Sequence, residues 1–109
     1  MKISEAKAGD YCILYVEGKV DSTQVDDFEK MILDPVERGE NKLVINCRGL
    51  TYISSTGLRV FLVAQKKMLG RKGKLYLCEL TKPVLETVAI SGFSTLFKIF
   101  ETEGEALEA

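Results

Sequence analysis

The sequence predicts an α/β fold, with a mixed β-sheet of four to five strands and helices packed mainly on one face. Short apolar segments rich in β-branched residues alternate with longer segments whose apolar residues recur at helical spacing. Glycine, proline and small polar residues separate most of these segments. With 109 residues the chain is long enough for one core. We therefore expect a single domain over residues 1–109.

The first part of the chain predicts a β-hairpin. Residues 1–8 alternate weakly and suit an edge strand, and Gly9 and Asp10 suit the turn that follows. Residues 11–17 are apolar at both odd and even positions. A strand with two apolar faces is covered on both sides, so we expect it to be central. Residues 18–21 are expected to form a loop.

An amphipathic helix is expected after this loop. Asp21 or Ser22 is suited to cap it. Pro35 is expected to end or kink the helix near Leu33 or Asp34, because proline disrupts a helix interior. Its apolar residues recur at helical spacing, and they are Val25, Phe28, Met31 and Ile32.

A β-turn-α unit is predicted over residues 43–69. Residues 43–45 suit a buried strand, and residues 46–51 break the apolar pattern and are expected to form a turn. Small and hydroxylated residues open the helix, namely Ser54, Ser55, Thr56 and Gly57. Its apolar stripe consists of Leu58, Val60, Phe61, Leu62, Val63, Ala64, Met68 and Leu69.

The last third predicts a strand, a helix and a second strand. Residues 70–73 are basic and flanked by glycine, which suits a left-handed helix cap. A strand is expected at 74–78, a helix with Pro83 in its first turn that ends at Gly92, and an edge strand at 96–100. The buried side of this helix is expected to hold Val84, Leu85, Val88 and Ala89. Residues 101–109 suit a final helical turn or a frayed tail.

Composition argues against several classes of function. A net charge of −1 gives no electrostatic case for nucleic acid or an anionic membrane. The basic pairs Lys66-Lys67 and Arg71-Lys72 are interpreted as a helix end. The N-terminus lacks the apolar segment of a signal peptide, and no apolar run is long enough to span a bilayer. We therefore expect a cytoplasmic protein with no membrane insertion.

The chain contains no histidine, which removes the common nucleophilic triads and zinc sites. No glycine-rich phosphate loop or metal-loop spacing of carboxylates is present. Cys12, Cys47 and Cys78 are far apart and odd in number, so we interpret them as small buried thiols. The sequence therefore predicts no enzyme, cofactor or metal site.

The hydroxyl groups at residues 54–56 have two interpretations. Serine and threonine oxygens commonly accept hydrogen bonds from the free N–H groups of a first helical turn. Alternatively, one hydroxyl receives a phosphate, which the helix dipole and these N–H groups would tolerate. Arg59 lies four residues after Ser55, on the same helical face, and would be able to pair with that phosphate or simply be a surface charge.

This region resembles the signature of the STAS domain, found in bacterial anti-sigma factor antagonists and at the cytoplasmic ends of anion transporters. The family pattern is an apolar strand, a turn, an aromatic residue and then Asp-Ser-Ser/Thr-Gly-Leu opening a helix. The chain matches it with LVINCRGL, Tyr52-Ile53 and Ser54-Ser55-Thr56-Gly57-Leu58. The resemblance extends over about residues 11–107, and it includes Gly18, Val20 and Asp21 and the segment GF-x-x-LFKIF.

The resemblance implies a phosphorylation-switched protein-binding module that sequesters an anti-sigma factor serine kinase. By position Ser55 falls on the serine that this kinase phosphorylates, with Ser54 as the second choice, and a serine phosphatase is a further implied partner. The implied partner-binding residues are Asp21, Ser54, Ser55, Thr56, Gly57 and Arg59.

Two positions depart from the family pattern. Ser54 replaces the usual Asp beside the acceptor, and Asn46 replaces a frequent Asp at the strand end. The first departure leaves an alternative open, a constitutive and unphosphorylated accessory subunit of a transport or signalling complex. Nucleotide binding at the start of this helix is a third and weaker hypothesis. A monomer is expected in either case.

Overall fold

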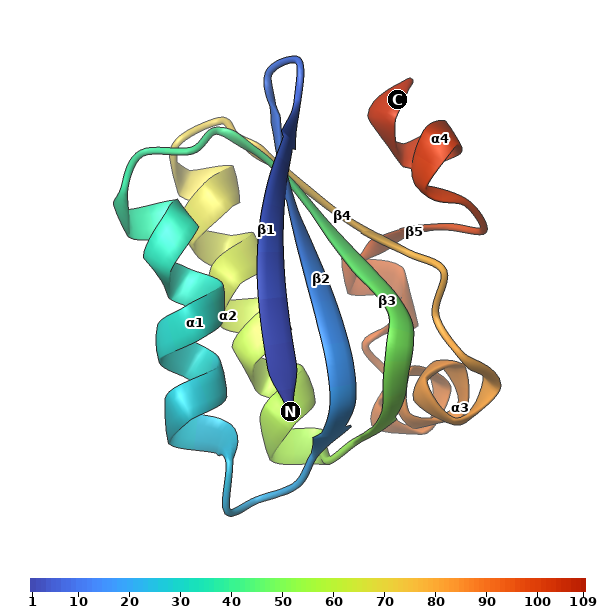
Figure 1. Ribbon diagram of the computed structural model, residues 1–109. Coiled ribbons are helices and arrows are strands. Elements are labelled where there is room, and N and C mark those ends of the chain that lie inside the picture. Colours follow the sequence, from blue (N-terminus) through green and yellow to red (C-terminus); the bar gives the residue numbers. More distant parts are fainter.

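A computed structural model describes all 109 residues, and five strands alternate with helices along the chain (Figure 1). The strands are β1 (Lys2–Ala8), β2 (Tyr11–Val20), β3 (Lys42–Ile53), β4 (Lys74–Cys78) and β5 (Lys98–Phe100). The helices are α1 (Val25–Glu37), α2 (Ser55–Gly70), α3 (Lys82–Ser91) and α4 (Glu103–Leu107), with a 3₁₀ turn at Ser94–Leu96.

The strands follow one another across a single sheet in the order β1-β2-β3-β4-β5. β1 is antiparallel to β2, and every later neighbour is parallel. One helix joins each parallel pair, and right-handed crossovers that always advance in the same direction place their helices on the same face. α4 follows β5 and packs on the other face. The predicted fold class is confirmed.

The sheet separates two apolar clusters. The larger cluster joins α1, α2 and α3 to one face, and the Phe28 and Phe61 rings meet in it at 5.5 Å between centroids. Val84 and Val88 of α3 enter the same cluster. The smaller cluster lies under α4 on the opposite face and contains Tyr11, Ile13, Val44, Cys78 and Ala106. β2 contributes to both clusters, which confirms that it is a central strand.

Several predicted boundaries agree with the structure. The hairpin turns at Gly9, which has a positive φ of 60°. β4 begins and ends where the sequence predicted, Pro83 lies in the first turn of α3, and Gly92 ends that helix in the left-handed conformation. Cys12, Cys47 and Cys78 are free and buried, as expected.

The predicted turn at residues 46–51 is wrong, because β3 continues through them to Ile53. β2 likewise continues through Val20, so the loop expected at 18–21 is also wrong at its start. The register between β2 and β3 shifts twice along this stretch, which absorbs the extra residues of β3 as bulges. Gly49 permits this arrangement, since a Cβ there would lie 2.7 Å from Cγ of Glu17.

The predicted cap of α1 is wrong, and the helix does not end near Leu33 or Asp34 but at Glu37. Gln24 occupies the N-cap position, and no side chain forms a cap hydrogen bond there, so neither Asp21 nor Ser22 caps the helix. Pro35 lies inside α1. It removes one backbone hydrogen bond near the end of the helix, and its ring is buried.

Four apolar side chains expected to be buried are exposed, namely Met31, Leu69, Leu85 and Ala89. The left-handed residue after α2 is Lys72, with a φ of 60°, rather than a glycine. Leu96 belongs to the 3₁₀ turn, so β5 is shorter than expected. The C-terminal residues form the short helix α4 rather than a frayed tail, and Thr102 and Glu105 make its capping box.

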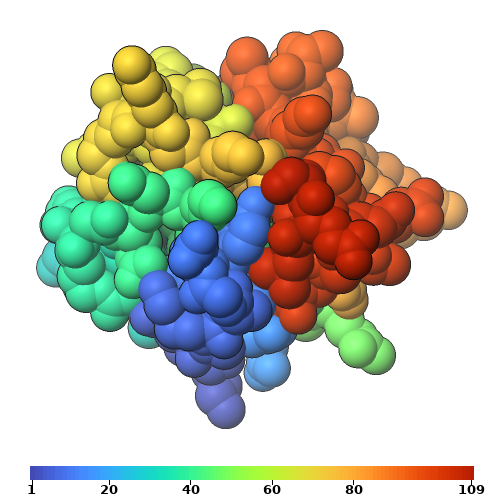
Figure 2. All heavy atoms as spheres, turned by 90° about the horizontal axis from the view of Figure 1, so that it is seen from above, coloured from blue at the N-terminus to red at the C-terminus, as the bar shows by residue number.

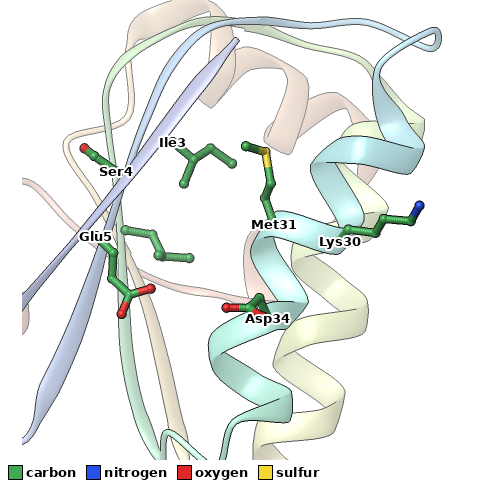
Figure 3. A pocket seen from close by; sticks show the side chains of 7 residues that line it. Ile3, Ser4, Glu5, Lys30, Met31 and Asp34 are labelled. Carbon is green, nitrogen blue, oxygen red and sulfur yellow. The ribbon is translucent and has the colours of Figure 1, made fainter.

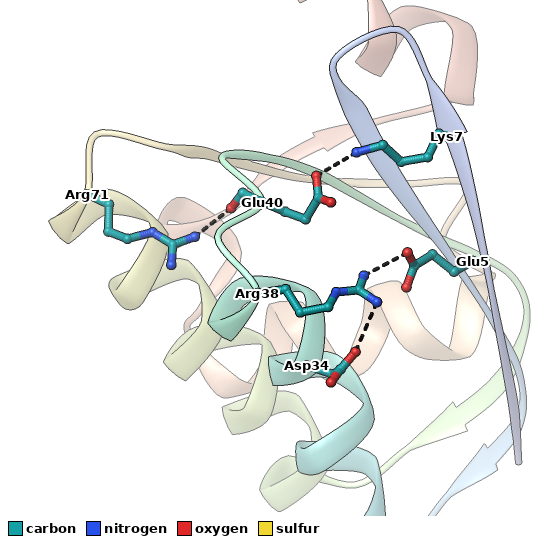
Figure 4. A network of polar contacts seen from close by, with 6 residues as sticks. All are labelled: Glu5, Lys7, Asp34, Arg38, Glu40 and Arg71. Carbon is teal, nitrogen blue, oxygen red and sulfur yellow. Dashed lines mark hydrogen bonds and ion pairs between the residues drawn. The ribbon is translucent and has the colours of Figure 1, made fainter.

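Ion pairs connect edge strand β1 to the end of α1 (Figure 4). Arg38 contacts Glu5 at 2.7 Å and Asp34 at 3.2 Å, and Lys7 contacts Glu40 at 2.7 Å. All of these groups are partly solvated, so each pair contributes little to stability. They link edge strand β1 to the C-terminal end of α1 and the residues that follow it.

Candidate functional site

The start of α2 is attached to the end of β2 through Ser54. The Ser54 N–H donates to the carbonyl of Val20 at 2.8 Å. The Ser54 hydroxyl accepts from the Gly57 N–H at 3.1 Å and lies 3.0 Å from the Thr56 hydroxyl. Ser54 is therefore the N-cap of α2, and two of the three predicted hydroxyls are engaged with each other.

Ser55 differs from its two neighbours. It is the first residue of α2, it is exposed, and its hydroxyl has no hydrogen-bond partner in the chain. Capping therefore accounts for Ser54 and leaves the Ser55 hydroxyl free. Arg59 follows one turn later, also exposed and without an ion pair. The free N–H groups and the dipole of the helix favour negative charge at this position.

Gly57 is buried between the end of β2 and the end of β3. A Cβ at this position would lie 2.9 Å from Cγ1 of Ile53 and 3.0 Å from Cγ1 of Val20. Only glycine therefore permits the first turn of α2 to approach both strands this closely. The role of Gly57 is to hold Ser54 and Ser55 at the rim of the sheet.

Asp21 lies next to this turn because it follows Val20 directly. Its carboxylate accepts from the N–H of Thr23 at 2.9 Å and from the hydroxyl of the same residue at 2.5 Å. The hydrogen bond from the Thr23 hydroxyl is the main reason why the pKa of Asp21 is lowered. Asp21 stays ionised near neutral pH and stiffens the loop that enters α1.

The sequence did not indicate a binding role for Tyr52, the penultimate residue of β3, which is 46% exposed. Its register partner on β2 is Lys19. Exposed aromatic side chains are frequent anchors of protein interfaces. The signal in the sequence was an aromatic residue two positions before the capping serine, but its exposure depends on where β3 ends.

The cavities of the molecule lie elsewhere. The cleft between β1 and α1, of about 330 Å³, has Ile3, Leu14 and Met31 as its apolar lining, with Glu5 and Asp34 at its edge (Figure 3). None of the four cavities is lined by Asp21 or by residues 54–59. The candidate site is thus an exposed surface, which suits a protein partner better than a small ligand.

Comparison with known proteins shows the family of this chain. The family model of the STAS domain matches residues 2–106. The chain belongs to the STAS domain family. A relative from Bordetella bronchiseptica, BtrV, carries the name of an anti-sigma factor antagonist and is 35% identical over 109 residues, which are 100% of this chain and 94% of BtrV.

Solved STAS domains have the same fold. An anti-sigma factor antagonist from Mycobacterium paratuberculosis superimposes with a TM-score of 0.89 at 18% identity, covering 98% of this chain and 91% of that protein. The antagonist SpoIIAA in its unphosphorylated form superimposes with a TM-score of 0.81 at 17% identity, covering 98% of this chain and 94% of that protein. The phosphorylated form of SpoIIAA, from Bacillus, superimposes with a TM-score of 0.73 at 16% identity, covering 98% of this chain and 97% of that protein.

This STAS domain contains no helix with the length and hydropathy needed to cross a membrane. No group of three or more carboxylate or cysteine side chains is placed to hold a metal ion.

Proposed function

We propose that this STAS domain is an anti-sigma factor antagonist, a binding module rather than an enzyme, which binds an anti-sigma factor serine kinase while Ser55 is unmodified. The observation that carries this proposal is the free, exposed Ser55 hydroxyl at the start of α2. The name of BtrV and the existence of SpoIIAA in two phosphorylation states support it. We expect the free protein to be a cytoplasmic monomer.

The local structure favours Ser55 over Ser54 as the acceptor. A phosphate on Ser54 would occupy the oxygen that accepts from Gly57 and would remove the cap of α2. A phosphate on Ser55 leaves this hydrogen bond in place and lies at the positive end of the helix dipole. Arg59, on the same helical face, is the nearest cation in sequence for a charge-assisted hydrogen bond.

The phosphate acts on the partner rather than on the fold. It adds about −1.5 to −2 charges to a surface made of neutral hydroxyls. A partner that packs apolar or acidic groups there must desolvate or repel this charge. A penalty of about 3 kcal/mol weakens binding by more than about a hundredfold.

The proposed partner surface surrounds Ser55. It comprises Asp21, Ser54, Ser55, Thr56, Gly57 and Arg59, with Tyr52 added on the evidence of its exposure. A serine phosphatase that acts on phosphorylated Ser55 would restore binding.

The decisive experiment measures binding of Ser55 variants to the anti-sigma factor serine kinase of the same cell. Ser55→Ala is expected to bind like the unmodified protein, and Ser55→Asp is expected to lose binding. Ser4→Asp, an exposed serine on β1, supplies a matched control for added charge. Undiminished binding by Ser55→Asp would contradict the switch. Mass spectrometry of residues 52–59 from native protein would locate the phosphate.

One observation favours the alternative of a constitutive docking subunit. Ser54 provides a neutral cap where the antagonists usually provide a carboxylate, so the acceptor lacks an acidic neighbour. Ser54→Asp distinguishes the two functions, since Asp is an equally good N-cap. If kinase transfers phosphate to Ser55 in both proteins, the switch is intrinsic. Transfer to the Asp variant alone would support the constitutive role.

A further inference from the structure

We propose that the corner formed by the end of α2, the turn after it and the start of β4 docks this protein on an anionic lipid surface. This inference concerns the opposite end of α2 from Ser55 and does not depend on the proposed function. The net charge of the whole chain is only −1, but several of its cations lie close together in sequence at this corner.

Five cations lie within nine residues of sequence at this corner: Lys66, Lys67, Arg71, Lys72 and Lys74. All five are exposed, and residues 60–78 contain no carboxylate. None of the five cations forms an ion pair within the chain, and Glu40, whose carbonyl contacts Arg71, pairs through its carboxylate with Lys7 at 2.7 Å. The corner therefore presents a local excess of positive charge.

An apolar side chain stands among these cations. Leu69 is 61% exposed in the last turn of α2, and its sequence neighbour Met68 is fully buried in the core. In a space-filling view of this end of the molecule, the yellow atoms of the turn form a projecting corner (Figure 2). An exposed leucine close in sequence to several cations matches the chemistry of a lipid interface, where the apolar group enters and the cations meet headgroups.

The corner is held in a fixed shape. The Arg71 guanidinium donates to the carbonyls of Val36 and Glu40, at the end of α1 and just after it, and keeps its charge. Lys72 adopts the left-handed conformation with a φ of 60°, where glycine is much preferred. The fold thus holds an exposed lysine at a position where glycine is usually found.

The shape and composition favour lipid over the other anionic partners. A projecting corner has no groove in which to enclose an acidic peptide, and none of the cavities is lined by these residues. Single-stranded nucleic acid is bound by cations together with aromatic side chains on which bases stack, and residues 66–74 contain no aromatic residue. A fluid anionic surface accommodates an exposed leucine together with neighbouring cations.

The test is co-sedimentation with vesicles of phosphatidylcholine alone and of phosphatidylcholine mixed with phosphatidylglycerol. We expect binding to the mixed vesicles only, and release as sodium chloride is raised. Lys66→Glu with Lys72→Glu is expected to lower binding at least about tenfold. Leu69→Ser is expected to lower binding without changing its salt dependence.

Lys2→Glu with Lys82→Glu is the matched control, because it changes net charge equally at exposed positions near the opposite end of the sheet. This control is expected to retain binding, and an equal loss would overturn the assignment to the corner. Absence of binding to mixed vesicles at the lowest salt would overturn the proposal outright. Binding to soluble polyglutamate but not to vesicles would do the same and would assign the corner to an acidic protein segment.

Discussion

The N–H of Gly57 donates to the hydroxyl of Ser54 at 3.1 Å, and this single contact separates the roles of two adjacent serines. Ser54 completes the first turn of α2, and Ser55 is left with a free hydroxyl. The residue that caps the helix and the proposed phosphate acceptor are therefore different residues. This division makes the stability of the domain and its proposed regulation independently testable.

Replacing Ser54 by Ala is expected to destabilise the fold by about 1 kcal/mol, because the Gly57 N–H loses its acceptor. Ser54→Asp retains the cap and is expected to be at least as stable as the natural protein. Urea unfolding followed by circular dichroism measures both. Ser55→Ala is the control and is expected to change stability by less than about 0.5 kcal/mol. A larger effect at Ser55 than at Ser54 would contradict the assignment of the cap.

Gly57→Ala is expected to destabilise the domain by about 1–3 kcal/mol, because the new Cβ would overlap Ile53 and Val20. Gly70→Ala is the matched control at the other end of α2, where nothing lies within 4 Å of an added Cβ. That variant is expected to gain about 0.5–1 kcal/mol. Thermal unfolding of the pair reports the difference, and a neutral Gly57→Ala would show that the first turn relaxes easily.

The succession of strands and helices was predictable from the sequence because it depends on local periodicity. Segment 74–78 and the helix bounded by Pro83 and Gly92 carry strong signals of this kind, and the structure agrees with both. The features that local periodicity did not predict depend on tertiary contacts. β3 extends past its apolar run because Gly49 lets it pack against Glu17, and α1 passes through Pro35 because that ring is buried.

The candidate site was predictable as a region but not residue by residue. The motif indicated that hydroxyls open α2, yet the spacing gave no means of separating Ser54 from Ser55. Ser54 is identified as the cap by its contact with Gly57, and its N–H also donates to the Val20 carbonyl, a contact between residues far apart in sequence. Asp21 was expected to cap a helix, but its carboxylate is used by Thr23.

The three thiols are expected to be unreactive in the folded protein. Burial raises the pKa of Cys12 to about 11 and that of Cys78 to about 12, and it also raises the pKa of Cys47. Reaction with a disulfide reagent near neutral pH is expected to be negligible before unfolding and to reach three equivalents afterwards. Rapid reaction of one thiol in the native protein would contradict its burial.

The same shifts predict a loss of stability in alkali. Below the ordinary thiol pKa of 9.0 both folded and unfolded chains hold their thiol protons, so there is no effect. Between 9.0 and about 11, the unfolded chain loses the Cys12 proton and the folded chain keeps it, which favours unfolding. Unfolding free energy is therefore expected to fall as pH rises through this window. Cys12→Ala is expected to make the decline shallower.

Asn46 differs from the Asp that is frequent at its position in the family, and the structure gives this difference a consequence. Asn46 is only 5% exposed, and its amide donates to the Glu103 carboxylate of α4 at 3.1 Å. Asn46→Asp would place two carboxylates together and remove this hydrogen bond. We expect it to destabilise the domain by about 1–3 kcal/mol near neutral pH.

The penalty of Asn46→Asp is expected to depend on pH and on Glu103. Proximity of the two carboxylates raises the pKa of the pair in the folded state, so the penalty is full above that raised pKa and disappears as pH falls below the unfolded value. Glu103→Gln supplies the matched background, because its side-chain oxygen accepts from Asn46 and its amide donates to an Asp at position 46. In the Glu103→Gln background, Asn46→Asp is expected to lower the free energy of unfolding only slightly. An equal loss of stability in both backgrounds would show that repulsion from Glu103 is not the cause.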